Sequence, residues 1–335
     1  RGARGARGAR GARGAMMTAP ARAAMYPFQD RLPAPVYWIY RAFRTLTVAL
    51  CFAGFWSGAV VIGWLWLPVL WLWPGERAAR IRRVHRTVRS GFRLFHVVMR
   101  ALRLYHRTSP AARLRPGDAP VVLVANHPTL CDVTSIASLF PGVVAVAGPQ
   151  YAANPLLGRL VRACGFVATG SHMLRECEAR LRMGFDVLVF PEGTRSPLGG
   201  GLQPFHRGAF ELAARAKVPI VLLKLTCVPP ALSKRLPIWK VADRMAVLTI
   251  EPFDVIYPAA LGSAALGSAA LGSAALGSAA LGSAALGSAG LGTDSRALCR
   301  AIEQRYCDMF GYPAPEVRAP SAVPTSEPQP LGDSP

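Results

Sequence analysis

Several common catalytic signatures are missing from this 335-residue chain. It has no G-x-S-x-G nucleophile elbow, no H-E-x-x-H zinc motif and no Walker loop. These absences exclude the serine hydrolases, zinc proteases and P-loop nucleotide hydrolases that such motifs identify. A reacting hydroxyl, if there is one, is therefore expected to belong to the substrate.

Acidic residues are scarce. The chain has 18 Asp and Glu against 39 Lys and Arg, which gives a formal net charge of +21 at pH 7. Such an excess favours an anionic partner, either a lipid surface or a nucleic acid. Arg, Ala, Gly and Pro are all abundant, so part of the excess is also consistent with a biased genome, and charge by itself does not decide between these partners.

Cysteine pairs at metal or redox spacing are also missing. The seven Cys are odd in number, scattered and without a C-x-x-C motif. They predict reduced, mostly buried thiols in a protein that faces the cytosol. Cys131 is a weak candidate nucleophile, because His127 is its one evident activating neighbour in the sequence.

Charged residues are absent from residues 45–75, a run long enough to cross a bilayer at about 20 residues per span. The run begins too far from the amino terminus for a cleaved signal peptide, so a retained anchor is expected. Its scattered Trp residues are consistent with a tilted span or a re-entrant helix. Arg residues are more numerous on its carboxyl side, which predicts that the catalytic part lies in the cytoplasm.

A basic amphipathic helix is predicted over residues 77–107. Apolar residues recur there at three- and four-residue steps and Arg fills most of the remaining positions. Such a helix lies well on an anionic leaflet. It is also consistent with a scaffold helix that packs on the catalytic core and exposes its Arg face to solvent, and both interpretations remain open.

Two short apolar runs end abruptly in polar residues. Residues 121–132 read VVLVANHPTLCD and residues 186–196 read DVLVFPEGTRS. This pattern is typical of buried parallel strands, which deliver functional side chains at their carboxyl ends. The two strand ends are expected to lie side by side and form one site.

In the first run, Asn126 and His127 follow the strand and Asp132 comes five residues after His127. An extended path between them would span about 17 Å, so the carboxylate reaches the imidazole only if the chain turns back. Pro128 and Thr129 favour that turn, and Asp132 is predicted to cap the following helix. A carboxylate that fixes one ring nitrogen leaves the other free as a general base. The alternative is a capping Asp beside an incidental His.

In the second run, Glu192, Gly193, Thr194 and Arg195 stand at the strand end. Gly allows a ligand to approach the backbone, Thr offers a donor, and Arg can hold a phosphate or carboxylate in a bidentate manner. Considered separately, they also fit a turn with a surface ion pair. Further on, Arg207 follows a Gly-rich loop and is either a head-group contact or part of a plain helix start.

From residue 120 onward, short apolar runs alternate with helical stretches, which predicts an α/β fold. We expect a mixed, largely parallel sheet flanked by helices and preceded by an N-terminal membrane-anchoring helical segment. Strands are expected at residues 121–125, 143–148, 165–169, 186–190, 219–226 and 246–250. Helices are expected at residues 132–140, 155–164, 171–183, 207–216 and 294–309. In the third helix, Leu174, Cys177 and Leu181 should face inward, while Arg175, Arg180 and Arg182 should face solvent or donor phosphates.

Low-complexity segments complete the predicted organisation. Residues 1–15 repeat RGA and are expected to be disordered, as an expansion upstream of a start at Met16 or Met17. The LGSAA repeats of residues 260–293 are expected to be a surface insertion within the α/β domain of residues 108–312, and residues 313–335 a disordered tail. Residues 16–44 form an N-terminal segment, 45–75 the anchor and 76–107 the basic helix.

The motifs NHPTLCD and FPEGTRS resemble the N-H-x-x-x-x-D and F-P-E-G-T-R-S blocks of the lysophospholipid acyltransferase family, including 1-acylglycerol-3-phosphate acyltransferases. The resemblance continues through FHRGAF and VPIVLL and covers roughly residues 120–258. Within the family, the chain looks most similar to the acyltransferases of bacterial aryl-polyene synthesis, judging from ANHPTLCDV, RSPLGGGLQPFHRGA and CVPPALSK.

The resemblance implies that His127 deprotonates an acceptor hydroxyl, that Asp132 orients His127, and that an acyl thioester is attacked. It implies acceptor contacts from further residues, namely Asn126, Glu192, Gly193, Thr194, Arg195 and Arg207. The donor would be acyl-coenzyme A or acyl carrier protein, with no bound cofactor or metal. The other partners would be a lysophospholipid and an anionic lipid surface, not nucleic acid, at a bacterial inner membrane with the catalytic domain on its cytoplasmic face.

Two departures from the family pattern remove positive charge. Gly170 and Ser171 stand where the family carries an Arg, and residues 148–150 replace another basic residue. The acceptor is therefore either a lysophospholipid such as 1-acylglycerol-3-phosphate or another amphiphile of aryl-polyene or ornithine-lipid type. A thioesterase or esterase would use the same His and Asp with water as the acceptor.

Overall fold

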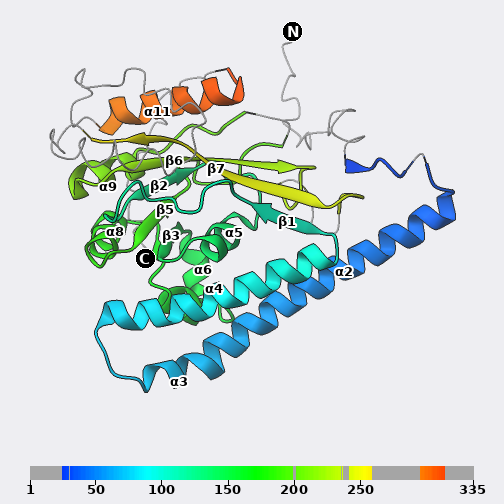
Figure 1. Ribbon diagram of the computed structural model, residues 1–335, viewed down its shortest axis with the longest axis horizontal. Coiled ribbons are helices and arrows are strands. Elements are labelled where there is room, and N and C mark those ends of the chain that lie inside the picture. Colours follow the sequence, from blue (N-terminus) through cyan, green and yellow to red (C-terminus); the bar gives the residue numbers. More distant parts are fainter. Residues whose placement is uncertain are drawn as a thin grey trace, which may run out of the picture.

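The computed structural model describes residues 25–29, 31–198, 201–234, 236, 241–258 and 295–313. In this part of the chain a seven-stranded mixed sheet lies between two layers of helices, and a long helical hairpin flanks one layer (Figure 1). The predicted fold class is confirmed. The low-complexity segments predicted at residues 1–15 and 260–293, and all but the first residue of the predicted tail, lie outside the described residues.

The sheet has the order β1-β7-β6-β2-β5-β3-β4. Strands β6, β2, β5, β3 and the edge strand β4 run parallel, β7 runs antiparallel to β6, and β1 runs parallel to β7. The strands are β1 (Tyr105–Thr108), β2 (Val122–Ala125), β3 (Val143–Ala147), β4 (Val167–Ala168), β5 (Asp186–Val189), β6 (Ile220–Val228) and β7 (Ala246–Ile256). The carboxyl ends of β2 and β5 are therefore neighbours, as the two motifs require.

Helices cover one face of the sheet with a core of large apolar side chains. These helices are α8 (Met173–Arg182), α9 (Gly208–Ala216) and α11 (Ser295–Phe310). Phe210, Ile302 and Tyr306 are fully buried among them. The predicted outward position of Arg180 is wrong, because the residue is only 5% exposed. Its Nε donates to the Gly165 carbonyl at 2.8 Å, which connects α8 to the loop before β4.

The opposite face is covered by α5 (Asp132–Leu139) and by α4 (Arg77–Ala101), with α6 (Pro149–Ala153) and α7 (Gly158–Ala163) nearby (Figure 1). The predicted helix over residues 77–107 ends early. Arg103 adopts a left-handed backbone with φ 53°, which stops the helix, and the chain continues as β1 beside β7.

The N-terminal helix is longer than the predicted anchor. Helix α2 (Ala34–Val60), a π-helical turn (Val61–Trp66) and α3 (Leu67–Trp71) form one helix of 38 residues with a mean hydropathy of 1.9 in its most apolar window. Its length and composition are sufficient to cross a membrane. It begins before residue 45 and includes the buried Arg44, whose Nε donates to the Ala242 carbonyl at 2.9 Å.

Candidate active site

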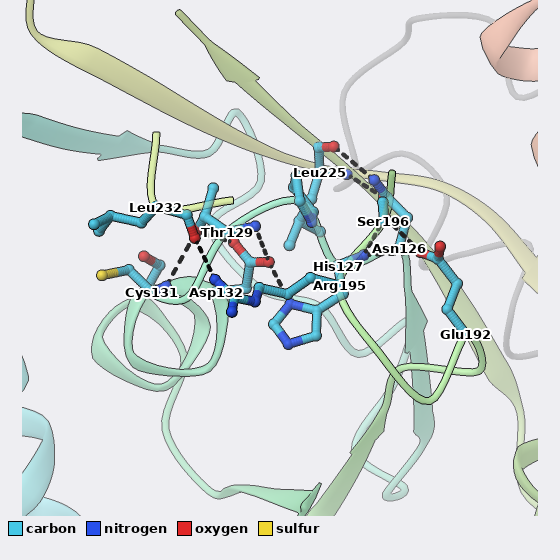
Figure 2. A network of polar contacts seen from close by, with 12 residues as sticks. Asn126, His127, Thr129, Cys131, Asp132, Glu192, Arg195, Ser196, Leu225 and Leu232 are labelled. Carbon is cyan, nitrogen blue, oxygen red and sulfur yellow. Dashed lines mark hydrogen bonds and ion pairs between the residues drawn. The ribbon is translucent and has the colours of Figure 1, made fainter. Parts of the chain in front are cut away.

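The turn between β2 and α5 brings an imidazole and a carboxylate together (Figure 2). His127 Nδ1 lies 2.7 Å from Asp132 Oδ2, and Asp132 is fully buried. The backbone N–H of Thr129 donates to Asp132 Oδ2 at 2.8 Å and the Thr129 hydroxyl donates to Oδ1 at 2.6 Å. Asp132 does not cap α5 as predicted, because it is the first residue of the helix and its oxygens are engaged by the turn.

The imidazole of His127 is held on a second side by an aromatic ring. Its centroid lies 4.1 Å from that of Phe190, with an angle of 18° between the ring planes. Because the carboxylate accepts from Nδ1, the ring is in the tautomer that leaves the lone pair of Nε2 free. The side chain retains 19% exposure, so the imidazole is partly accessible from outside the protein.

The loop after β5 fixes the backbone of His127. The backbone N–H of His127 donates to Glu192 Oε1 at 3.2 Å and to Ser196 Oγ at 3.1 Å, and Ser196 N donates to the His127 carbonyl at 2.8 Å. The Ser196 hydroxyl in turn donates to Glu192 Oε1 at 2.5 Å. The second motif therefore supports the first one directly, at the junction of two neighbouring strands (Figure 2).

Two residues that were expected to contact the acceptor are instead enclosed by protein. Glu192 is 3% exposed and its Oε2 accepts from Gln203 N at 2.9 Å. Asn126 is 4% exposed and exchanges two hydrogen bonds of 2.8 Å with the backbone of Leu225 in β6. Both side chains satisfy backbone groups where strands end, so the structure gives them a role in shaping the site.

The remaining residues of the second motif are more accessible. Gly193 is exposed, and Thr194 and Arg195 are half-buried. Gly193 has φ +62°, and a Cβ there would lie 3.1 Å from the His206 ring, which explains the need for glycine. Arg195 Nη1 donates to the Leu232 carbonyl at 2.7 Å.

A third loop, after β6, completes the site and was missed by the sequence reasoning. The Leu232 carbonyl also accepts from Leu130 N at 3.1 Å, and Ser233 Oγ donates to the Pro128 carbonyl at 3.2 Å. Leu232 adopts φ 53°, an uncommon backbone conformation for a residue with a side chain. No local sequence pattern predicts a hydrogen bond to a carbonyl about 100 residues away. Phe190 and Ser196, by contrast, stand inside the FPEGTRS motif.

Arg207 follows His206, whose backbone N–H donates to the Pro191 carbonyl in the second motif at 2.8 Å. It is exposed at the start of α9 and lines a surface pocket with Glu211, Arg215 and Ser295, between α9 and α11. The head-group contact expected of Arg207 therefore stays a prediction beside the plain helix start.

Cys131 does not have the properties of a nucleophile. It is 4% exposed, and burial followed by the nearby Asp132 carboxylate raises the pKa of its thiol well above the ordinary value. The thiol therefore stays neutral at physiological pH. Among the residues that the structure describes, no group of three or more His, Cys, Asp or Glu is placed to hold a metal ion.

Comparisons with known proteins agree with the geometry. Residues 105–224 match the family model described as Acyltransferase. Over 119 residues the chain is 32% identical to a chloroplast 1-acyl-sn-glycerol-3-phosphate acyltransferase of Brassica napus, a match that covers 33% of this chain and 34% of the relative. Over 115 residues it is 36% identical to the human 1-acyl-sn-glycerol-3-phosphate acyltransferase alpha, covering 32% and 40% of the two chains. The chain thus spans little more than a third of these relatives.

A solved structure shares the fold. The 1-acyl-sn-glycerophosphate acyltransferase PlsC from Thermotoga maritima superposes with a TM-score of 0.53 at 20% sequence identity, covering 70% of this chain and 94% of that one. The family-model match and the named relatives show that residues 105–224 are similar to acyltransferases, among them 1-acyl-sn-glycerol-3-phosphate acyltransferases, and the solved structure shares the fold.

Proposed function

We propose that this chain is a membrane-associated O-acyltransferase that moves an acyl group from an acyl thioester to a hydroxyl of a lysophospholipid such as 1-acylglycerol-3-phosphate. The observation that carries the proposal is the 2.7 Å contact between His127 Nδ1 and the buried carboxylate of Asp132, at the mouth of a sheet whose family match is to acyltransferases. The names of the relatives support the acceptor.

The chemistry follows from the pair. Nε2 of His127 takes the proton of the acceptor hydroxyl as its oxygen attacks the thioester carbonyl. Asp132 holds the Nδ1–H and stabilises the imidazolium that forms. When the tetrahedral intermediate collapses, the C–S bond breaks and the imidazolium returns its proton to the leaving thiolate. The products are an ester and a free thiol, and His127 is neutral again.

Ser196 is not the attacking group in this mechanism. Its oxygen accepts from His127 N and its hydroxyl donates to Glu192, and the residue is 8% exposed. The nucleophile therefore comes from the substrate, as the missing serine motif suggested.

Arg195 and Thr194 are the proposed contacts for the polar head of the acceptor, since both are partly exposed and Arg195 lies beside the His127 turn (Figure 2). Residues 148–150 and 170–171, near the carboxyl ends of β3 and β4, supply no cation. This favours a second candidate acceptor, an amphiphile of aryl-polyene or ornithine-lipid type, whose polar head needs less positive charge.

The proposed location is a bacterial inner membrane with the catalytic domain on the cytoplasmic face. The exposed apolar side chains of α2 and of the π-helical turn after it support contact with lipid, among them Trp38, Ile39 and Leu65, at 67%, 71% and 68% exposure. The predicted division into anchor, basic helix and acyltransferase domain is part of this proposal.

The decisive experiment offers the purified full chain an acyl thioester and several acceptors, and identifies the products by mass spectrometry. His127→Ala should lower turnover by about 10²- to 10⁴-fold, whereas His172→Ala, an exposed histidine at the start of α8, should leave it unchanged. Undiminished acyl transfer by His127→Ala would refute the mechanism. Free fatty acid formed at the same rate without an acceptor would instead identify a thioesterase.

A further inference from the structure

Three arginine side chains converge on the carboxyl end of α5. Arg89, in α4, donates from Nε to the Ser138 carbonyl at 3.2 Å and from Nη2 to the Leu139 carbonyl at 2.7 Å. Arg93, one turn further along α4, donates from Nε to the same Ser138 carbonyl at 3.1 Å. Arg107, in β1, donates from Nε to Ser138 Oγ at 2.5 Å. Two helices and a strand therefore meet at this arginine cluster.

The cluster has too little negative charge around it. None of the ion pairs in the described part of the chain includes Arg89, Arg93 or Arg107. The carboxyl end of a helix offers only about half a unit of negative charge. Burial, and after it the neighbouring Arg93, lowers the pKa of both Arg89 and Arg107 below the usual value for arginine. The cluster therefore has an excess of about two positive charges that calls for a counter-ion.

Donors remain available for such a counter-ion. Each guanidinium carries five N–H groups. Within the described residues, the Nε of each arginine and one terminal nitrogen of Arg89 have protein acceptors, which leaves the terminal nitrogens of Arg93 and Arg107 for a ligand. Arg93 is exposed, while Arg89 and Arg107 are half-buried. Planar forks of this kind match the oxygens of a phosphate group.

The same part of α4 exposes apolar side chains. Leu94, Val97 and Val98 are 66%, 60% and 40% exposed. Residues 93 and 97 lie one turn apart on the helix surface, so the cations border the apolar patch. Helix α4 also packs beside α2, whose exposed side is apolar (Figure 1). A ligand with a phosphate at the cluster would have its hydrocarbon chains next to apolar protein surface, as at a lipid head-group boundary.

We propose that Arg89, Arg93 and Arg107 bind the phosphate group of an anionic phospholipid at the membrane surface. This site is separate from the catalytic pair: Asp132 begins the eight-residue helix α5 and Ser138 lies near its other end, about 9 Å away at 1.5 Å per residue. The site does not depend on the proposed transferase mechanism.

The test uses the full chain in detergent micelles and measures retained lipid by native mass spectrometry. The lipids are phosphatidylglycerol, an anionic phospholipid that is not the expected product, and oleate, which is anionic without phosphate. The triple variant R89Q/R93Q/R107Q should lose about tenfold or more of the preference for phosphatidylglycerol over oleate. The matched variant R82Q/R86Q/R100Q removes the same charge from exposed positions of α4 and should keep that preference.

Equal loss of preference in the two triple variants would show that net charge alone attracts lipid, and would overturn the proposal. All three arginines help to hold α5, but the Ser138 carbonyl keeps its hydrogen bond from Arg89 when Arg93 is replaced, so Arg93→Gln is the milder variant, at an exposed position. It should lower the preference for phosphatidylglycerol several-fold while the temperature of unfolding stays that of the parent chain. An unchanged preference in Arg93→Gln and in the cluster variant, even with lower stability, would assign the arginines to helix capping only and reject the lipid site.

Discussion

Glu192 is a buried carboxylate that organises the candidate site. Burial raises the pKa of its carboxyl above the ordinary value, and hydrogen bonds from Gln203, Ser196 and His127 oppose this only in part. The folded protein therefore holds this proton more tightly than the unfolded chain. The stabilisation from the group is complete below pH ~4.5 and is lost as the pH rises through the pKa of the folded state.

This sign leads to a prediction for Glu192→Gln, whose side chain does not ionise. From about pH 4 to pH 7 the wild-type chain should lose unfolding free energy that the variant keeps. Thermal unfolding across this pH range measures the difference. Glu76→Gln is the control, because Glu76 is exposed at the start of α4. A variant whose pH dependence follows that of the wild type would show that Glu192 does not titrate in this window.

Asp132→Asn should separate orientation from mere packing. An amide of nearly the same shape has no charge and cannot stabilise an imidazolium. In one of its two orientations, its NH₂ group also faces the N–H groups of Thr129 and His127, which are donors themselves. We expect kcat to fall by about 10²- to 10⁴-fold with a smaller change in acceptor KM. Asp118→Asn, an exposed position before β2, should leave both constants unchanged. A loss confined to KM would argue that Asp132 only shapes the binding site.

The residues nearest to the chemistry were predictable because their signals are local. A strand, a turn and a helix within twelve positions bring His127 and Asp132 together. The burial of Glu192 and Asn126 was not predictable in the same way, since it depends on Gln203 and on Leu225 in β6. Polar residues in a motif at a strand end suggest ligand binding. The backbone N–H and C=O groups that have no strand partner where the sheet ends also need hydrogen bonds, and such side chains can supply them.

Helices α2 and α4 run side by side (Figure 1), and the chain from the start of α2 to the end of α4 carries most of the large exposed apolar side chains of the described residues. On α2, Ile39, Leu46 and Leu50 are 71%, 57% and 63% exposed. Each such residue favours lipid, whereas an Asp at the same depth costs about 2.5 to 3.5 kcal/mol. Contact between this hairpin and lipid is therefore the proposed basis of membrane association.

The combined variant Ile39→Asp, Leu46→Asp and Leu50→Asp should weaken vesicle binding by well over tenfold, measured by flotation. The native fold should persist because the replaced side chains point outward. Val228→Asp is a control at the end of β6, where a similar apolar side chain is 68% exposed outside the hairpin. Equal flotation of the combined variant and the wild type would contradict lipid contact by this side of α2.

Elements with strong periodicity were predicted and weakly patterned ones were not. Strands β2, β3, β5 and β6 are buried apolar runs, and each was expected within a few residues of its observed bounds. Strand β1 reads YHRT, which has no apolar alternation, and its pairing with β7 joins Tyr105 to Ala246. Such a pairing depends on distant chain, so the basic helical pattern was extended through it by mistake.

Helix α11, the last of the described elements, packs on one face of the sheet. The Tyr306 hydroxyl lies 2.7 Å from the Val124 carbonyl and 2.9 Å from the Leu223 carbonyl, in a fully buried position. It therefore satisfies two strands at once, between the sheet and the helix layer. This contact joins positions 182 residues apart.

Tyr306→Phe should cost about 1–3 kcal/mol of unfolding free energy, because both carbonyls lose a buried donor. Thermal or denaturant unfolding in detergent measures this loss. Tyr312→Phe, just beyond α11, removes a hydroxyl from a half-buried side chain and should have a smaller effect. Indistinguishable stability of the two variants would mean that water replaces the tyrosine hydroxyl in the core.

The late position of Tyr306 has a consequence for biosynthesis. A ribosome releases the apolar helix α2 long before it has made α11, so the catalytic sheet stays incomplete while its membrane-seeking segment is already outside the exit tunnel. On the proposed membrane association, α2 is free to contact lipid before α11 completes the domain. Premature termination before Ser295 would accordingly leave a domain without Tyr306 and its two buried hydrogen bonds.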